Sequence, residues 1–192
     1  MAFYTGYINL PTTSYADWKA AVNGNGYDAD GYYGDQCWDL VSEFWWNIGF
    51  PTMYPQTGPN EAASEIWTVS RANNTAYDGT VYFDLIYNIQ DIKRGDIVVY
   101  DGIPGHTGFA DKDYDANDGG LYILGQNQGT GGTPTPIGNP NGGTTANVKK
   151  LNLTFLGAFR YRGWVTPPVT RAKQHFPWVL RARKLNQMRN QM

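Results

Sequence analysis

The stretch Asp28-Ala-Asp-Gly-Tyr-Tyr-Gly-Asp-Gln-Cys-Trp-Asp39 contains Cys37, the only cysteine of the chain. Apolar residues recur behind this thiol at helical spacing, which predicts a helix from about Asp35, as its N-cap, to Ile48. A helix start favours a thiolate, because its dipole and its free N–H groups stabilise negative charge. Cys37 is therefore a candidate nucleophile. The alternative is a small buried apolar residue, since free cysteines are often buried.

Length and composition fit one domain with a core rich in large rings. The chain has 192 residues, of which 15% are aromatic, and a single cysteine excludes an intrachain disulfide. Residues 1–9 have neither a basic nor an apolar segment, so we expect no signal peptide. No apolar run reaches transmembrane length, so we expect no transmembrane segment either.

The charge of the chain is divided unevenly. The net charge is −2, yet residues 166–192 hold six cations and no carboxylate, which leaves an acidic body. An acidic body argues against nucleic acid as a partner. We therefore divide the chain into a catalytic domain, residues 1–165, and a proline-containing linker with a basic helical tail, residues 166–192. The tail is expected to bind an anionic polymer or membrane, to dock on a partner, or to be a solvated extension.

The order of secondary-structure signals predicts an α+β domain. Ser14 and Asp17 mark a helix that ends near Val22, and Asn60 marks another that ends near Arg71. Strand signals take over afterwards, and an antiparallel meander following helices is typical of this class. The expected strands are 96–100, 107–114, 121–124 and a strand or pair in 155–165, with a long surface loop at 129–147.

A thiol nucleophile needs a base, and the chain has two histidines. His106 lies between two expected strands, which hold a side chain rigidly, whereas His175 lies in the tail. We therefore expect His106 to be the base; its alternative is a structural histidine. A base also needs a partner for its second nitrogen. Asn127, at the end of the next strand, is the candidate, and its alternative is a turn asparagine.

Spacing of the carboxylates before Cys37 is typical of a calcium loop. Counting from Asp28, carboxylates stand at positions 1, 3 and 12, with backbone carbonyls available between them. Tyr33 replaces the glycine expected at position 6 of an EF-hand. A plain Asp-rich turn is the alternative. Zinc is the weaker metal, because one cysteine and two scattered histidines do not make a tetrahedral site.

Over roughly residues 10–165 the chain resembles the CHAP domain, the cysteine, histidine-dependent amidohydrolase/peptidase of phage endolysins. The likeness is to the calcium-binding modules of staphylococcal phages. The segment from Asp28 to Leu40 carries it most specifically. Further motifs support it, namely Gly95-Asp96-Ile97, Gly105-His106, Ile123-Leu-Gly-Gln-Asn127 and Phe159-Arg-Tyr-Arg-Gly-Trp164.

The resemblance implies a papain-like fold in which N-terminal helices pack on an antiparallel sheet. It implies that Cys37 is the nucleophile, His106 the base and then acid, and Asn127 the orienter of the imidazole. Gln36 is a candidate oxyanion donor, or else a helix-surface glutamine. The calcium ligands would be the side chains of Asp28, Asp30 and Asp39, with the carbonyls of Tyr32 and Gly34. Related endolysins often have a Glu where this chain has Gly125, which leaves a catalytic triad.

The expected function is hydrolysis of a cell-wall amide by thiol acyl transfer, as an N-acetylmuramoyl-L-alanine amidase or a peptide-crosslink endopeptidase. The enzyme would be encoded by a phage or prophage and act on peptidoglycan, delivered through holin-dependent release or in the virion. Two alternatives stay open. One is a virion-associated structural protein with this fold, docked through its tail, and the other is a cysteine protease on protein substrates. Aromatic residues near the motifs are candidates for a substrate groove or for ordinary packing: Tyr33, Trp38 and Trp164.

Overall fold

A computed structural model describes residues 1–74, 80–128, 143 and 145–164. Three α-helices lie in this part of the chain: α1 (Tyr15–Val22), α2 (Cys37–Asn47) and α3 (Glu65–Ser70). Short 3₁₀ helices occur at Arg71–Asn73, Ile89–Asp91, Ala116–Asp118 and Arg162–Trp164. The predicted basic tail, and residues 129–142 of the predicted loop, lie outside the described residues.

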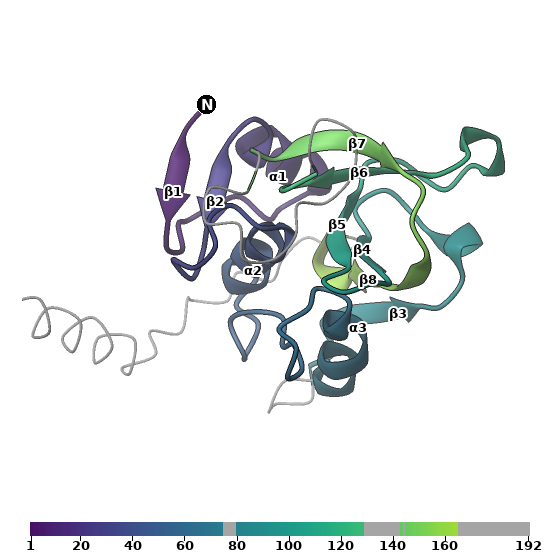
Figure 1. The fold of residues 1–192 in the computed structure, drawn as a ribbon, viewed down its shortest axis with the longest axis horizontal. Helices are drawn as coiled ribbons and strands as arrows, with labels where there is room; N and C mark the ends of the chain where they lie inside the picture. The colour runs from purple at the N-terminus through teal and green to yellow at the C-terminus, as the bar shows by residue number, and fades with distance from the viewer. Residues whose placement is uncertain (75–79, 129–142, 144, 165–192) are drawn as a thin grey trace, which may run out of the picture.

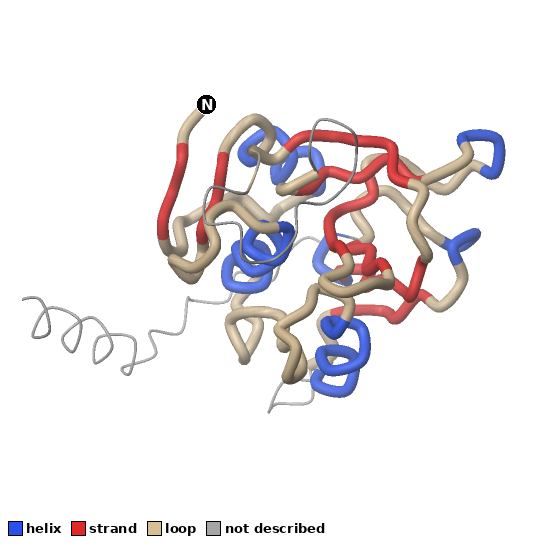
Figure 2. Tube along the Cα trace, viewed as in Figure 1, coloured by secondary structure: helices blue, strands red, loops and turns tan. Residues whose placement is uncertain are grey.

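A six-stranded antiparallel sheet has the order β3-β8-β4-β5-β6-β7 (Figure 1). Its strands are β3 (Phe83–Ile86), β4 (Ile97–Tyr100), β5 (His106–Ala110), β6 (Leu121–Gly125), β7 (Asn147–Leu151) and β8 (Phe155–Tyr161). A separate parallel pair joins β1 (Phe3–Thr5) to β2 (Gly26–Asp28). In Figure 2, α2 lies between the β1–β2 pair and the main sheet, and it contacts both β2 and β5. The predicted α+β class is confirmed.

Helix α2 packs on the sheet through its apolar residues. Leu40, Val41, Phe44 and Trp45 are all buried, as their helical spacing predicts. The Phe44 ring meets Phe109 of β5 edge-on, with centroids 5.3 Å apart. Trp18 of α1 contacts both of these rings. This aromatic cluster fixes the helix that begins at Cys37 against the strand that begins at His106.

Both faces of the central strand β4 are buried. Ile97 and Val99 face the cluster that contains α1 and α2, while Val98 and Tyr100 face a second cluster. This alternation follows from the two-residue period of a strand. The second cluster includes Ile92 from the chain before β4. A continuous apolar run, Ile97-Val-Val-Tyr100, therefore marks a strand covered on both sides.

The sequence located some elements better than others. Ser14 caps α1 by accepting from the backbone N–H of Asp17, as predicted, and α1 ends at Val22. The predicted N-cap of α2 is wrong by one residue, because Gln36 rather than Asp35 precedes the first helical turn. Helix α3 begins at Glu65, later than the predicted start at Asn60. The predicted loop also proved shorter at its end, since Asn147 begins β7.

Among the residues that the structure describes, no helix combines the length and apolar character that crossing a bilayer requires.

Candidate active site

Cys37 and His106 meet where the start of α2 touches the start of β5. The backbone N–H of Thr107 lies close enough to the Cys37 sulfur to lower the pKa of the thiol. The sulfur therefore lies beside the peptide that joins His106 to Thr107. Cys37 keeps 9% of its surface exposed, whereas His106 is fully buried. The two predicted residues are brought to one place, and both are buried.

The Cys37 thiol is protonated at neutral pH. Burial raises its pKa to about 11, although hydrogen bonds from backbone N–H groups, that of Thr107 foremost, act in the opposite direction. The negative charge of Asp39 raises the pKa further. The backbone N–H groups of Cys37 and Trp38 at the helix start lower the pKa of the thiol, in the direction predicted, but burial outweighs them in this state. Desolvation outweighs the helix dipole because the charge would form in the interior.

His106 presents a neutral imidazole. Burial lowers its pKa to about 4, and an interaction with the Gln128 side chain partly offsets this. Its ring lies nearly parallel to that of Tyr100, its partner in β4, with centroids 6.4 Å apart. Strand β6 pairs with β5 only at Phe109 and Ala110, beyond the histidine. Thiol and imidazole are thus an uncharged pair, and the proton must move during the reaction rather than before it.

Asn127 and Gln128, which follow β6, contact different residues of the site. Asn127 has a left-handed backbone, with φ of 54°, and its side-chain nitrogen donates to Oε1 of Gln36 at 2.6 Å. Gln128 is the amide whose side chain interacts with the imidazole of His106. The sequence did not single out Gln128. The role of Asn127 as orienter of the imidazole stays a prediction.

Gln36 is held by several bonds at the helix start. Its side-chain nitrogen donates to the carbonyl of Tyr33 at 2.6 Å, and its backbone N–H donates to Asp39 at 2.8 Å. Its own carbonyl accepts from the side chain of Gln126 at 3.0 Å. The side-chain amide of Gln36 carries two N–H donors, and the bond to Tyr33 uses one of them. The role of Gln36 as oxyanion donor also stays a prediction.

Three carboxylates converge in front of α2. Asp28, Asp30 and Asp39 each place an oxygen within 4.8 Å of the other two. Asp39 is almost fully buried, and burial together with the charges of Asp30 and Asp28 raises its pKa to about 9. Three acids at this spacing cannot all ionise cheaply unless a cation joins them. The cluster is therefore a possible metal site.

The loop that carries these acids is tightly curled. Asp28 accepts from the N–H of Gly31 at 2.9 Å, and Asp30 accepts from the N–H of Tyr32 at 2.8 Å. Tyr33, at the position where an EF-hand has glycine, adopts a left-handed backbone with φ of 64°. The turn is thus made without the glycine. Both expected carbonyl donors, those of Tyr32 and Gly34, belong to this curled segment.

Asp39 connects the loop to the helix. One carboxylate oxygen accepts from the N–H of Ala29 at 2.9 Å, and the other accepts from that of Gln36 at 2.8 Å. Whatever fixes Asp39 therefore also fixes the residue that precedes Cys37.

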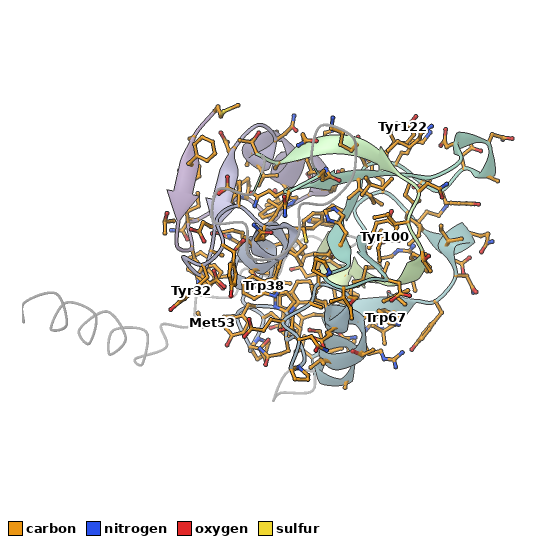
Figure 3. All side chains as sticks on the ribbon, viewed as in Figure 1. Tyr32, Trp38, Met53, Trp67, Tyr100 and Tyr122 are labelled. Carbon is orange, nitrogen blue, oxygen red and sulfur yellow. The ribbon has the colours of Figure 1, made fainter. Side chains whose placement is uncertain are left out.

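The aromatic residues near the motifs separate into exposed and packed groups. Tyr32 and Tyr33 are exposed, and the half-buried Trp38 contacts the ring of Tyr54. Figure 3 shows Tyr32 and Trp38 on the same side of the molecule, with Tyr100 further into the sheet. Trp164 instead packs in the core, against rings that include Phe44. Of the three aromatic candidates for a substrate groove, Trp164 is therefore a packing residue.

Comparisons with known proteins agree with this architecture. A wild-type endolysin of known crystal structure, LysIME-EF1, superposes with a TM-score of 0.56 at 24% identity, over 83% of this chain and 67% of that one. The chain has an endolysin-like fold. A D-alanyl-L-alanine endopeptidase of Streptococcus phage B30 is 33% identical over 119 residues, which are 60% of this chain and 25% of the relative. This chain thus corresponds to about a quarter of the length of that curated relative. No family model matches the chain.

Proposed function

We propose that the chain is a phage peptidoglycan hydrolase that cleaves an amide bond by thiol acyl transfer. The observation that carries this proposal is the proximity of the Thr107 backbone N–H to the Cys37 sulfur, which puts a thiol at a helix start next to a histidine at a strand start. This is the arrangement that cysteine hydrolysis requires, with nucleophile and base on separate rigid elements. The endolysin-like fold and the relative from phage B30 support a cell-wall substrate.

The neutral pair sets the order of the chemical steps. His106 takes the thiol proton as the Cys37 sulfur attacks the amide carbon, so that a carbon–sulfur bond forms and an oxyanion develops. Backbone N–H groups at the start of α2, with Gln36 as a further donor, stabilise that oxyanion. His106 then passes the proton to the leaving amine as the carbon–nitrogen bond breaks. Water hydrolyses the thioester with His106 as base, which returns the free thiol.

Between the two amide classes, the peptide-crosslink endopeptidase is favoured. The relative from phage B30 is named for cleavage between D-alanine and L-alanine, and its likeness extends over 119 residues of this chain. An N-acetylmuramoyl-L-alanine amidase uses the same thiol chemistry on a different amide, so the two differ in the product and not in the site.

We further propose that Asp28, Asp30 and Asp39 hold a calcium ion, together with the carbonyls of Tyr32 and Gly34. The three oxygens within 4.8 Å and the buried position of Asp39 fit a hard cation that prefers oxygen ligands. When bound, calcium would neutralise the Asp39 carboxylate, which raises the pKa of Cys37. The residues themselves then do the positioning, since Asp39 bonds both Ala29 and Gln36.

The proposals about delivery to the wall and about the partners of the basic tail rest on the sequence alone. We propose that the protein acts at the host wall after holin-dependent release or as a virion component. Wall polymer or virion proteins are the proposed partners of the basic tail.

The decisive experiment compares wild type with Cys37→Ser and His106→Gln on purified Gram-positive walls. We expect wild type to reduce turbidity and to release muropeptides with a new amino group at a peptide cross-link. Both variants should lose this activity while keeping cooperative thermal unfolding. Wall clearing by Cys37→Ser equal to that by wild type would refute the mechanism. Casein digestion without wall clearing would favour the protease alternative.

A further inference from the structure

We propose that Gln128 positions the imidazole of His106, with its side-chain oxygen accepting a hydrogen bond from Nε2–H. The proposal rests on the proposed function, because it assigns what holds the base of that reaction. It differs from the sequence-based expectation, which gave this task to Asn127.

Because Gly125 has no side chain, the side-chain amide of Gln128 and the ring of His106 can both approach its backbone. A Cβ atom at Gly125 would lie 3.4 Å from Nε2 of His106 and 3.4 Å from Oε1 of Gln128. The same Cβ would lie 3.3 Å from the amide carbon of Gln128. Both side chains therefore border the bare backbone of Gly125. Both are also fully buried, and neither ring nitrogen of His106 has a hydrogen bond to the described residues, so the proposed bond would supply the partner that Nε2 lacks.

Three carbonyls fix which end of the amide faces the ring. The side-chain nitrogen of Gln128 donates to the carbonyls of Ile123 at 3.2 Å, Gly125 at 3.0 Å and Asn147 at 2.6 Å. A flipped amide would place oxygen against three oxygens, so the nitrogen must stay on that side. The oxygen is thereby the atom directed toward the imidazole. The interaction with Gln128 raises the pKa of His106 against the effect of burial, as an acceptor of a ring N–H would.

The turn after β6 explains why Gln128 and not its neighbour reaches the histidine. The left-handed backbone of Asn127 reverses the chain, and its side chain bonds Gln36. Gln128 then folds back over the end of its own strand, where its nitrogen bonds Ile123 and Gly125.

An amide oxygen can accept but cannot donate, and it carries no full charge. It therefore selects the imidazole tautomer with hydrogen on Nε2 and leaves the lone pair of Nδ1 to receive the thiol proton. A carboxylate in the same place would select the same tautomer but would also favour the imidazolium. Gln128 thus orients the base without charging it.

The tautomer can be measured on the wild-type protein. Long-range ¹⁵N correlation spectra of histidine-labelled protein distinguish Nε2–H from Nδ1–H, and His175→Gln assigns the two rings. We expect His106 to carry its proton on Nε2 at neutral pH. A proton on Nδ1 would overturn the proposal without any mutation of Gln128.

Two variants test whether Gln128 positions the imidazole of His106 or only supports the β6–β7 connection. Gln128→Leu and Gln128→Glu both lose the nitrogen that bonds the three carbonyls, but only Glu keeps an oxygen for the ring. We expect Leu to lower kcat at least about tenfold with KM little changed, and to abolish the tautomer preference. Glu should restore much of kcat and raise the pH midpoint of the acid limb by about 1–3 pH units. Equal losses in both variants, with tautomer and pH profile unchanged, would leave Gln128 a purely structural residue.

A failure of the Gln128 proposal can be distinguished from a failure of the proposed function. If wild type clears walls through Cys37 but His106 has its proton on Nδ1, only the role of Gln128 is lost. If wild type has no Cys37-dependent activity, the function is lost, and the spectrum still decides how the ring is held.

Discussion

Phe44 of α2 and Phe109 of β5 meet edge-to-face, with ring centroids 5.3 Å apart and planes at 79°. These rings connect the helix that begins with Cys37 to the strand that begins with His106. Phe44→Ala should destabilise the protein by about 3–5 kcal/mol, because it leaves a cavity under both catalytic candidates. Urea unfolding measures this loss. The exposed Phe3 is the matched control, and Phe3→Ala should cost less than about 0.5 kcal/mol. Equal costs would contradict the assigned packing.

Asp39 provides the test of calcium binding. Wild type at a calcium concentration about 100 times the Kd should gain about 2.7 kcal/mol over the protein in EGTA. Asp39→Asn should lose that gain, because it removes a charge from the three-carboxylate cluster. The control is Asp35→Asn, in the same loop but outside the cluster. Thermal unfolding with and without calcium gives the comparison. A wild-type protein indifferent to EGTA would rule out the site.

Glu43 should make stability depend on pH. It is fully buried and accepts from the N–H of Ile8 at 3.3 Å, and burial raises its pKa from 4.5 to about 8. Between these two values the folded protein keeps a proton that the unfolded chain has lost. Stability should therefore fall as pH rises from about 4.5 to 8. Glu43→Gln should remove the part of this fall that Glu43 causes, while the part due to Asp39, whose pKa burial raises to about 9, remains.

Glu65 is the control for Glu43, because its pKa is lowered rather than raised. Hydrogen bonds from Ala62 and from Asn60 lower the pKa of Glu65. Glu65→Gln should therefore leave the fall between pH 4.5 and 8 in place. Chemical denaturation of the three proteins across this pH range gives the curves. Parallel curves for wild type and Glu43→Gln would show that Glu43 does not titrate there.

The buried Asp96 and the partly exposed Arg160 form an ion pair beside the start of β4. Both carboxylate oxygens of Asp96 accept from Arg160, at 2.9 and 2.8 Å, and one also accepts from the N–H of Lys93. Asp96→Ala should cost about 3–5 kcal/mol, because it leaves a guanidinium without its partner. The exposed pair Asp84–Arg162 is a natural control, and Asp84→Ala should cost at most about 1 kcal/mol. Urea unfolding of the two variants distinguishes them.

The sequence located the parts of the fold that depend on local chemistry. Ser14 caps α1 because its hydroxyl reaches the N–H of Asp17 within one turn. The apolar residues of α2 face the core because their helical spacing places them on one side of the helix. The short strands β1, β2, β3 and β7 were not predicted. Each of them is stabilised by a partner far away in the chain, as Phe3 is by Gly26, so no local pattern announces it.

The sequence singled out residues that the structure brings together, but it did not predict their electrostatics. A lone cysteine before an apolar helix and a histidine between strands are visible in the sequence, and the structure brings both to one place. The protonated thiol was not foreseen, because burial is a property of the packed molecule. Gln128 was missed for a related reason. Only the left-handed backbone of Asn127 decides which of two adjacent amides turns toward His106.

Residues 126–128 tie three separate segments to one short turn. Gln126 bonds Tyr27 of β2, Asn127 bonds Gln36, and Gln128 interacts with His106. Adding or deleting one residue here would displace all three of these contacts. This tripeptide should therefore tolerate changes of length poorly. Engineers who wish to retarget the protein by loop grafting should therefore place their junction after residue 128.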